Sequence, residues 1–248
     1  MSGLLAVYRR EMLSLWVTPL AWVLLVVFLL LQGASFYSIV HSYAAFSQLG
    51  VDSGPVQGYF GQSFFILVSL LIVCPALTMR LLAEERRSGT IESLLTAPVT
   101  SAAVVLGKYL ATLTTYAAMW APTVLYVFIL RKTGTVDWHV VGSSYLGLFG
   151  VGAGYLAIGT LMSAMTRSQL LALLLTAAVL FGLVILGLGE YIFEPGVLRD
   201  LSAHVSVMSQ FGEMSKGIVD LRRLVFDLSL VALPLFVAAR VVDSWRWG

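Results

Sequence analysis

The chain has 248 residues, of which 59% are hydrophobic and only 11% are charged, and its formal net charge is +2. Soluble domains are about 45–50% apolar and about 25% charged, so the composition excludes an ordinary soluble protein. The small net charge provides no footprint for nucleic acid. The single cysteine, Cys74, lies in an apolar run and offers neither a disulfide framework nor a zinc site. These features predict an integral membrane protein whose residues 1–248 form one domain.

The first 18 residues predict an amphipathic helix that lies at the membrane surface. Arg9 and Arg10 point toward the lipid headgroups, and Pro19 turns the chain into the first span. We expect this segment to remain on the protein and not to be a cleaved signal peptide. Its apolar face comprises Leu4, Leu5, Tyr8, Met12, Leu15 and Trp16.

Six segments are long and apolar enough to cross a bilayer, which requires about 20 residues per helix. None has a charged residue deep in its interior, since Lys108 and Asp227 lie at ends. Pro122 and Pro234 fall within spans, where neighbouring helices can satisfy the freed carbonyls. The fold class is therefore all-α, with spans over about 19–40, 58–79, 107–130, 140–165, 169–189 and 224–242.

The distribution of basic residues orients these spans, because cytoplasmic loops carry an excess of Lys and Arg. Six spans place both termini, the 80–108 loop and the 166–168 turn on one side. We expect this side to be cytoplasmic, in a bacterial inner membrane. Its basic residues are Arg9, Arg10, Arg80, Arg86, Arg87, Lys108, Arg167, Arg240 and Arg246. The other side carries Arg131, Lys132, Arg199, Lys216, Arg222 and Arg223.

Several kinds of chemistry are missing from the sequence. Gly107-Lys108 lacks the rest of a phosphate-binding loop, and the histidines are dispersed at His41, His139 and His204. We therefore expect no catalytic residue, metal or cofactor in this chain. Ion-driven carriers keep ionisable groups within the bilayer, so this class is disfavoured, although a sodium site lined by backbone stays open. Any energy for transport is expected to enter from outside the membrane.

The most charged stretch, "LLAEERRSGTIESLLTAPVT" at residues 81–100, predicts a cytoplasmic amphipathic helix over 81–97. Gly89 within it costs about 1 kcal/mol relative to alanine. Pro98 ends the helix, because a residue before proline disfavours the helical conformation. A solvated loop that only anchors topology is the alternative. An anchor needs basic residues alone, however, whereas this stretch adds three glutamates and an apolar stripe that a soluble partner could bind.

Three stretches carry a family resemblance. "EERRSGTIESLLTAPVTSAAVVLGKYLA" (84–111) resembles the signature of ABC-2 type permeases, the membrane subunits of ATP-binding-cassette exporters. "LMSAMTRSQLLALLLT" (161–176) resembles their short cytoplasmic turn between the fourth and fifth spans. "FGEMSKGIVDLRRLVFDLSLVALPLFVAARVVDSWRW" (211–247) is similar to the C-terminal segment of the gliding-motility-associated branch, although its tail has fewer basic residues.

The resemblance implies the ABC-2, or type V exporter, fold and a set of partners. A six-span permease would pair with an identical or related permease, above two ABC ATPase subunits that bind ATP and Mg²⁺. A periplasmic accessory protein is a further expected partner, together with membrane lipids. Residues 84–97 would be the coupling helix, and Arg167 a smaller second contact. The implied ATPase-coupling residues are Glu84, Glu85, Arg86, Arg87, Gly89, Thr90, Glu92, Leu95, Pro98 and Arg167.

Two further features bear on assembly. Gly150 and Gly154 form a G-x-x-x-G pattern that lets helices approach closely, and both packing within the chain and dimerisation stay open. The outer segment 190–223 resembles the external helices that cap the exit of such permeases. Its helical stripe comprises Phe211, Met214, Ile218 and Leu221, and its candidate residues are Phe211, Lys216, Asp220 and Arg222.

The sequence as a whole favours a permease subunit of an ATP-driven export or force-transmitting complex. A non-transporting anchor for a cell-envelope machine is the alternative, and an ion-coupled carrier is a third hypothesis. The cargo does not follow from the sequence.

Overall fold

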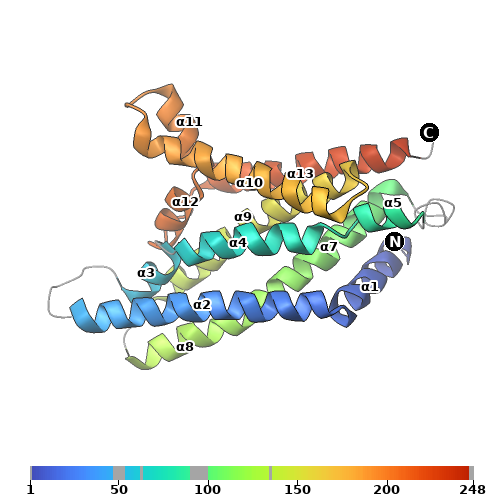
Figure 1. Cartoon of the computed structure of the whole chain (residues 1–248). Coiled ribbons are helices and arrows are strands. Elements are labelled where there is room, and N and C mark those ends of the chain that lie inside the picture. The colour runs from blue at the N-terminus through green and yellow to red at the C-terminus, as the bar shows by residue number, and fades with distance from the viewer. Residues whose placement is uncertain (1, 47–53, 62–63, 90–99, 134–135, 246–248) are drawn as a thin grey trace.

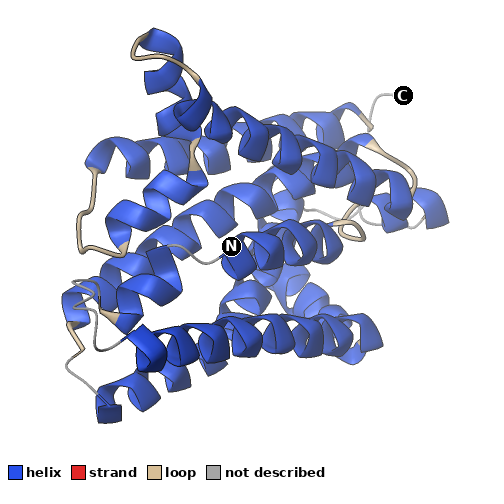
Figure 2. Cartoon of the chain, turned by 60° about the vertical axis from the view of Figure 1, so that its left-hand side comes forward, coloured by secondary structure: helices blue, strands red, loops and turns tan. Residues whose placement is uncertain are grey.

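A computed structural model describes residues 2–46, 54–61, 64–89, 100–133 and 136–245, and these contain helices and no strand (Figures 1 and 2). The predicted all-α membrane fold is confirmed. Six helical segments are long and apolar enough to cross a membrane: Pro19–Tyr43, Phe64–Ser88, Ser101–Lys132, Trp138–Met165, Gln169–Ile192 and Leu221–Ser244.

The helices in the first half of the chain differ from the prediction at the second span. Helix α1 (Ser2–Val17) precedes the first span, α2 (Pro19–Phe46). Over the expected second span, 58–79, the structure describes α3 (Pro55–Gly61) and α4 (Phe64–Thr78). A turn then leads to α5 (Ala83–Ser88). A Cβ on Gly61 would overlap Ser215 in the outer segment, so the end of α3 packs closely there.

The α-helix of the third span is interrupted by a 3-10 turn at Pro122. It begins as α7 (Ser101–Trp120), passes through the 3-10 turn η2 (Ala121–Thr123) and ends as α8 (Val124–Thr133). Pro122 has no N–H to donate within an α-helix. The Thr123 hydroxyl donates to the Trp120 carbonyl at 2.7 Å, so a side chain satisfies one backbone acceptor at this turn. Pro234 lies inside a helix that continues past it, α13 (Leu221–Ser244).

The second half supplies the centre of the molecule. Helix α9 (Trp138–Met165) contacts α4, α7, α13 and α10 (Gln169–Ile192). In α4 and α9, 67% of the most apolar window is buried, against 22% in α2, α10 and α13. Helices α2, α10 and α13 therefore present apolar faces outward, to lipid or to another subunit. Two short helices, α11 (Val197–Val205) and α12 (Val207–Met214), lie between α10 and α13.

Glycines on α9 allow this close packing. A Cβ on Gly152 would overlap the Tyr116 ring of α7, with Cε1 at 2.6 Å, and a Cβ on Gly154 would lie 2.7 Å from Cδ2 of Leu230 in α13. Tyr116 is also held in place, because its hydroxyl donates to the Leu148 carbonyl at 3.1 Å. The α9 surface is thus shaped to its neighbours at both contacts.

Replacing Gly152 with alanine should destabilise the protein by about 1–3 kcal/mol, the usual cost of overpacking a core. Gly142→Ala is the matched control, since it lies on the same helix with nothing within 4 Å of its Cβ. Thermal unfolding in detergent should show a lower midpoint for Gly152→Ala alone. Equal midpoints for both variants would contradict the tight α7–α9 contact.

Candidate functional site

Helices α1 and α5 and the end of α13 lie at the same end of the molecule (Figure 1), and several ion pairs form there. Helix α1 packs along α7, and the Ser101 hydroxyl at the start of α7 donates to Asp243 of α13 at 2.9 Å. Helix α5 lies at the same end. This arrangement agrees with the predicted topology, in which both termini, the 80–108 loop and the 166–168 turn share one side.

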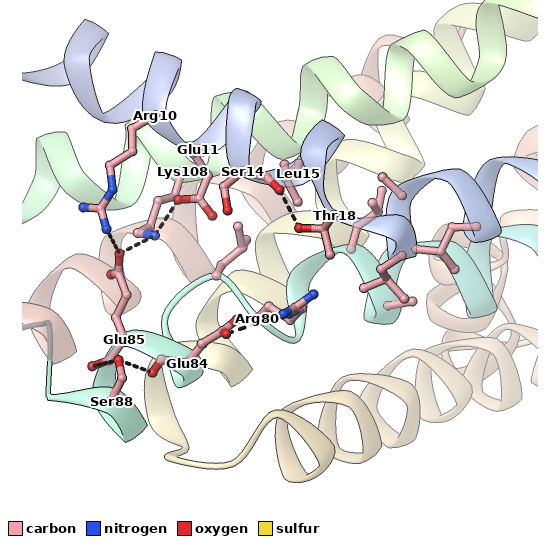
Figure 3. A pocket seen from close by; sticks show the side chains of 16 residues that line it. Arg10, Glu11, Ser14, Leu15, Thr18, Arg80, Glu84, Glu85, Ser88 and Lys108 are labelled. Carbon is pink, nitrogen blue, oxygen red and sulfur yellow. Dashed lines mark hydrogen bonds and ion pairs between the residues drawn. The ribbon is translucent and has the colours of Figure 1, made fainter.

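A buried lysine joins three elements at this end (Figure 3). The Nζ of Lys108 in α7 lies 2.8 Å from Oε2 of Glu11 in α1 and 3.0 Å from Oε1 of Glu85 in α5. Arg10 approaches the same Glu85 oxygen at 3.9 Å. The Lys108 side chain is only 2% exposed, and those of Glu11 and Glu85 are 15% and 11% exposed. We call Lys108, Glu11, Glu85 and Arg10 the ion cluster.

The backbones of α1 and α7 also approach each other closely beside the ion cluster. A Cβ on Gly107 would lie 3.0 Å from Val7 Cγ1 and 3.1 Å from the Leu4 carbonyl oxygen. Helix α1 therefore rests directly on α7 at the position before Lys108. Ion pairing and helix packing hold α1 in the same place.

Helix α5 is also tied to α9. The backbone N–H groups of Leu82 and Ala83 donate to the Ser163 hydroxyl at 3.1 and 3.2 Å, so a side chain from α9 satisfies amides at the start of α5. Arg86 donates to the Met165 carbonyl at 3.5 Å, and its guanidinium lies 4.8 Å from the ring centroid of Trp245. The α5 segment thus contacts the end of α9, next to the 166–168 turn.

The prediction of one helix over 81–97 is wrong at Gly89. Helix α5 ends at Ser88, and Gly89 has a φ of +74°, a left-handed conformation that glycine adopts without a side-chain penalty. Gly89 is therefore a helix stop and not a tolerated interruption. The remaining predicted coupling residues, Thr90, Glu92, Leu95 and Pro98, lie outside the described residues.

The structure separates the predicted coupling residues into inward and outward ones. Glu85, expected to face a partner, is buried in the ion cluster, which corrects its role to positioning α5. Glu84 pairs with Arg80 at 3.0 Å and is about half exposed. Arg87 and Arg167 are exposed. Among the residues that the structure describes, Arg87 forms no ion pair.

The opposite end of the molecule contains α3, α11 and α12 (Figure 1). The predicted outer stripe is wrong in its second half: Phe211 and Met214 are buried, but Ile218 and Leu221 are 55% and 72% exposed. Helix α12 ends at Met214, and a turn follows in which Gly217 has a φ of +81°, so the helical stripe does not continue.

The polar candidates of this outer segment have different positions. Lys216 and Arg222 are exposed, whereas Asp220 caps α13 by accepting a hydrogen bond from the Arg222 N–H at 2.9 Å. Arg223 is buried, and its Nε lies 2.9 Å from Oε2 of Glu213 in the outer segment. The capped helix and this ion pair fix the end of the outer segment to α13.

The two glycines of the G-x-x-x-G pattern face α13 of the same chain. A Cβ on Gly150 would lie 2.6 Å from Oδ2 of Asp227, and one on Gly154 would meet Leu230. The Asp227 carboxylate accepts a hydrogen bond from Gln210 at 2.7 Å and is 5% exposed. Gly150 thus makes room for a buried polar pair, and both glycines serve packing within the chain.

Sequence reasoning missed Glu11 and Gln210, and it treated Lys108 only as a topology marker. A signal for the first existed: Glu11 is the one acidic residue of the N-terminal helix and Lys108 the one charge near the start of the third span. Two isolated opposite charges on the same membrane side are candidates for a pair. Nothing in the sequence relates Gln210 to Asp227, which tertiary packing brings together.

Replacing Lys108 with methionine should cost about 3–5 kcal/mol, because Glu11 and Glu85 would remain buried without their cation. Denaturant unfolding of the purified chain in mixed micelles measures this cost. Lys132→Met, at an exposed position in α8, is the matched control and should have little effect. A Lys108→Met protein as stable as the control would show that the ion cluster does not hold α1 and α5.

Comparison with protein families matches residues 5–189 to the model described as ABC-2 family transporter protein. The matched region includes the ion cluster, α5 and the 166–168 turn, and it excludes α11, α12 and α13. A search of curated proteins found no match.

Proposed function

The chain belongs to the ABC-2 family of transporter proteins, and from this we propose that it is the membrane-spanning permease subunit of an ATP-driven exporter. An ABC ATPase, a separate subunit that binds ATP and Mg²⁺, would supply the energy. The family's membrane subunits are generally non-catalytic, and among the described residues no group of three or more metal-binding side chains occurs.

The observation that carries this proposal is the construction of the α5 end. Exposed Arg87 and exposed Arg167 lie on two segments that touch through Arg86 and Met165. Behind them, the ion cluster connects α5 to α1 and α7, and Ser163 connects it to α9. A push on this surface would reach α1 and the spans that contain α7 and α9 through short contacts. Such a surface suits the transmission of force from a soluble subunit.

The remaining parts of the proposal concern assembly and location. We propose that the protein lies in a bacterial inner membrane with the α5 end and both termini in the cytoplasm, and the excess of basic residues on that side supports this orientation. The outward apolar faces of α2, α10 and α13 support pairing with a second permease above two ATPase subunits. A periplasmic accessory protein would bind at α11 and α12. The likeness to the gliding-motility-associated branch rests on residues 211–247, beyond the matched region.

Reversing both exposed charges, with Arg87→Glu and Arg167→Glu together, should weaken the ATPase contact by tenfold or more. Hydrogen bonds to charged groups contribute about 1.5–3 kcal/mol each, and about 1.4 kcal/mol is a factor of ten. The measurement is co-purification and permease-stimulated ATP hydrolysis in nanodiscs, with the ABC ATPase that co-purifies with the unaltered chain.

Lys132→Glu with Arg222→Glu is the control, because both residues are exposed and lie away from the α5 end. Unchanged binding and hydrolysis in the Arg87/Arg167 variant would contradict the coupling surface. An ATPase variant that binds but does not hydrolyse ATP separates transport from anchoring. Cellular function that survives this variant would indicate the non-transporting anchor.

A further inference from the structure

A cavity of about 270 Å³ lies beside the ion cluster, between α1, the start of α2, the end of α4 and α5 (Figure 3). It is far larger than the roughly 30 Å³ that one water molecule occupies in the liquid, and it is close in size to small-molecule sites. Its lining combines charged residues, among them Arg80, Glu84 and Glu85, with apolar ones, among them Leu20, Leu24 and Leu77.

The position of the cavity matches the boundary between lipid and water. It adjoins the junction of the surface helix α1 with the first span, where Thr18 donates to the Ser14 carbonyl at 2.6 Å. Trp16 and Trp22 flank this junction with ring centroids 5.4 Å apart, and the Trp22 N–H donates to the Trp16 carbonyl. Tryptophan is enriched at the headgroup level of membranes. At this level of a membrane, lipid headgroups would meet the charged residues of the lining, and acyl chains would meet its leucines.

The charges that line the cavity are balanced. Three are basic, three are acidic, and their formal sum is zero: Arg10, Arg80, Lys108, Glu11, Glu84 and Glu85. A balanced lining favours a zwitterionic headgroup over an anionic one. Lys108 is already paired twice, whereas the Arg80 side chain is 33% exposed, and its planar guanidinium has more N–H donors than Glu84 uses.

The acceptors in the lining distinguish between zwitterionic headgroups. Glu84 is about half exposed, and Oε2 of Glu85 is buried with no hydrogen-bond partner among the described residues. An ethanolamine ammonium group can donate hydrogen bonds to such carboxylates, but choline has no N–H. Choline is typically recognised by aromatic cages, and none of the described residues that line this cavity is aromatic.

From these observations we infer that the cavity is a binding site for phosphatidylethanolamine. Arg80 binds the lipid phosphate through its planar fork, and Glu84 accepts hydrogen bonds from the ammonium group. The glycerol and the first acyl carbons lie against Leu20, Leu24 and Leu77. The bound lipid fills the space between α1 and α5 and so supports the arrangement that the ion cluster holds. This site does not depend on the proposed ATPase partner.

The test uses the purified, delipidated full chain, without any ATPase, in detergent. Native mass spectrometry measures the binding of phosphatidylethanolamine, phosphatidylcholine and phosphatidylglycerol with identical acyl chains. We expect phosphatidylethanolamine to bind at least about tenfold more tightly than the other two, since it alone combines a phosphate with N–H donors in a neutral headgroup. Equal binding of the three lipids, or no binding, would overturn the inference.

Two variants, each with a matched control, locate the site. Ser14→Trp places a large side chain at the exposed rim and should abolish the preference, whereas Leu13→Trp, 68% exposed and outside the lining, should keep it. Arg80→Ala should weaken binding by about tenfold, and Arg87→Ala, also outside the lining, should not. Thermal unfolding without lipid verifies that each variant is folded. A preference that survives Ser14→Trp in a folded protein would place the lipid elsewhere.

Free O-phosphoethanolamine distinguishes a lipid from a soluble ligand of the same chemistry. Binding of the free compound as tight as that of the lipid would refute a lipid site. Because no arm of this experiment includes ATP or an ATPase, its failure would leave the permease function untouched. Failure of the ATPase experiment would likewise leave the lipid site standing.

Discussion

The arrangement of this end of the molecule depends on one buried cation. Removing Lys108 from water is costly, and the cost is offset only because Glu11 and Glu85 both lie within 3.0 Å of it. Those carboxylates come from helices far apart in the chain, so satisfying Lys108 determines where α1 and α5 sit on α7. The same constraint turns Glu85 inward and leaves Arg87 exposed at the surface. Helix α5, which a soluble subunit could bind, is thereby held against the spans by direct contacts.

Packing at α9 provides the complementary constraint. Its glycines let α7 and α13 approach until side chains such as Tyr116 and Leu230 touch the α9 backbone. The central helices α4 and α9 are consequently covered by other helices of the chain, whereas α2, α10 and α13 have apolar faces that point outward. Charge lies mostly at the two ends, where the ion cluster and the Arg223–Glu213 pair each fasten peripheral segments to this centre. The cavity beside the ion cluster lies where such a segment, α1, meets the spans.

The errors of sequence interpretation have specific causes. Gly89 was placed inside a helix because the apolar stripe on either side continued in phase, but its left-handed conformation ends α5. Ile218 and Leu221 continued the spacing of Phe211 and Met214, yet the turn at Gly217 ends the helical stripe before them. Periodicity measures which residues could share a face; it does not report the backbone turn that a glycine permits.

Apolar run length was sufficient to establish a six-span helical membrane protein, because a helix must satisfy its own backbone hydrogen bonds in lipid whatever surrounds it. The interruption of the third span at Pro122 and the sharing of one side by both ends of the chain follow from equally local rules. Which charges are buried was decided only by the tertiary structure. Glu84 and Glu85 are adjacent and chemically alike; Arg80, four residues earlier, pairs with Glu84, but no local rule buries Glu85. They differ because Lys108 and Glu11, distant in the chain, are brought by packing to one of them and not the other.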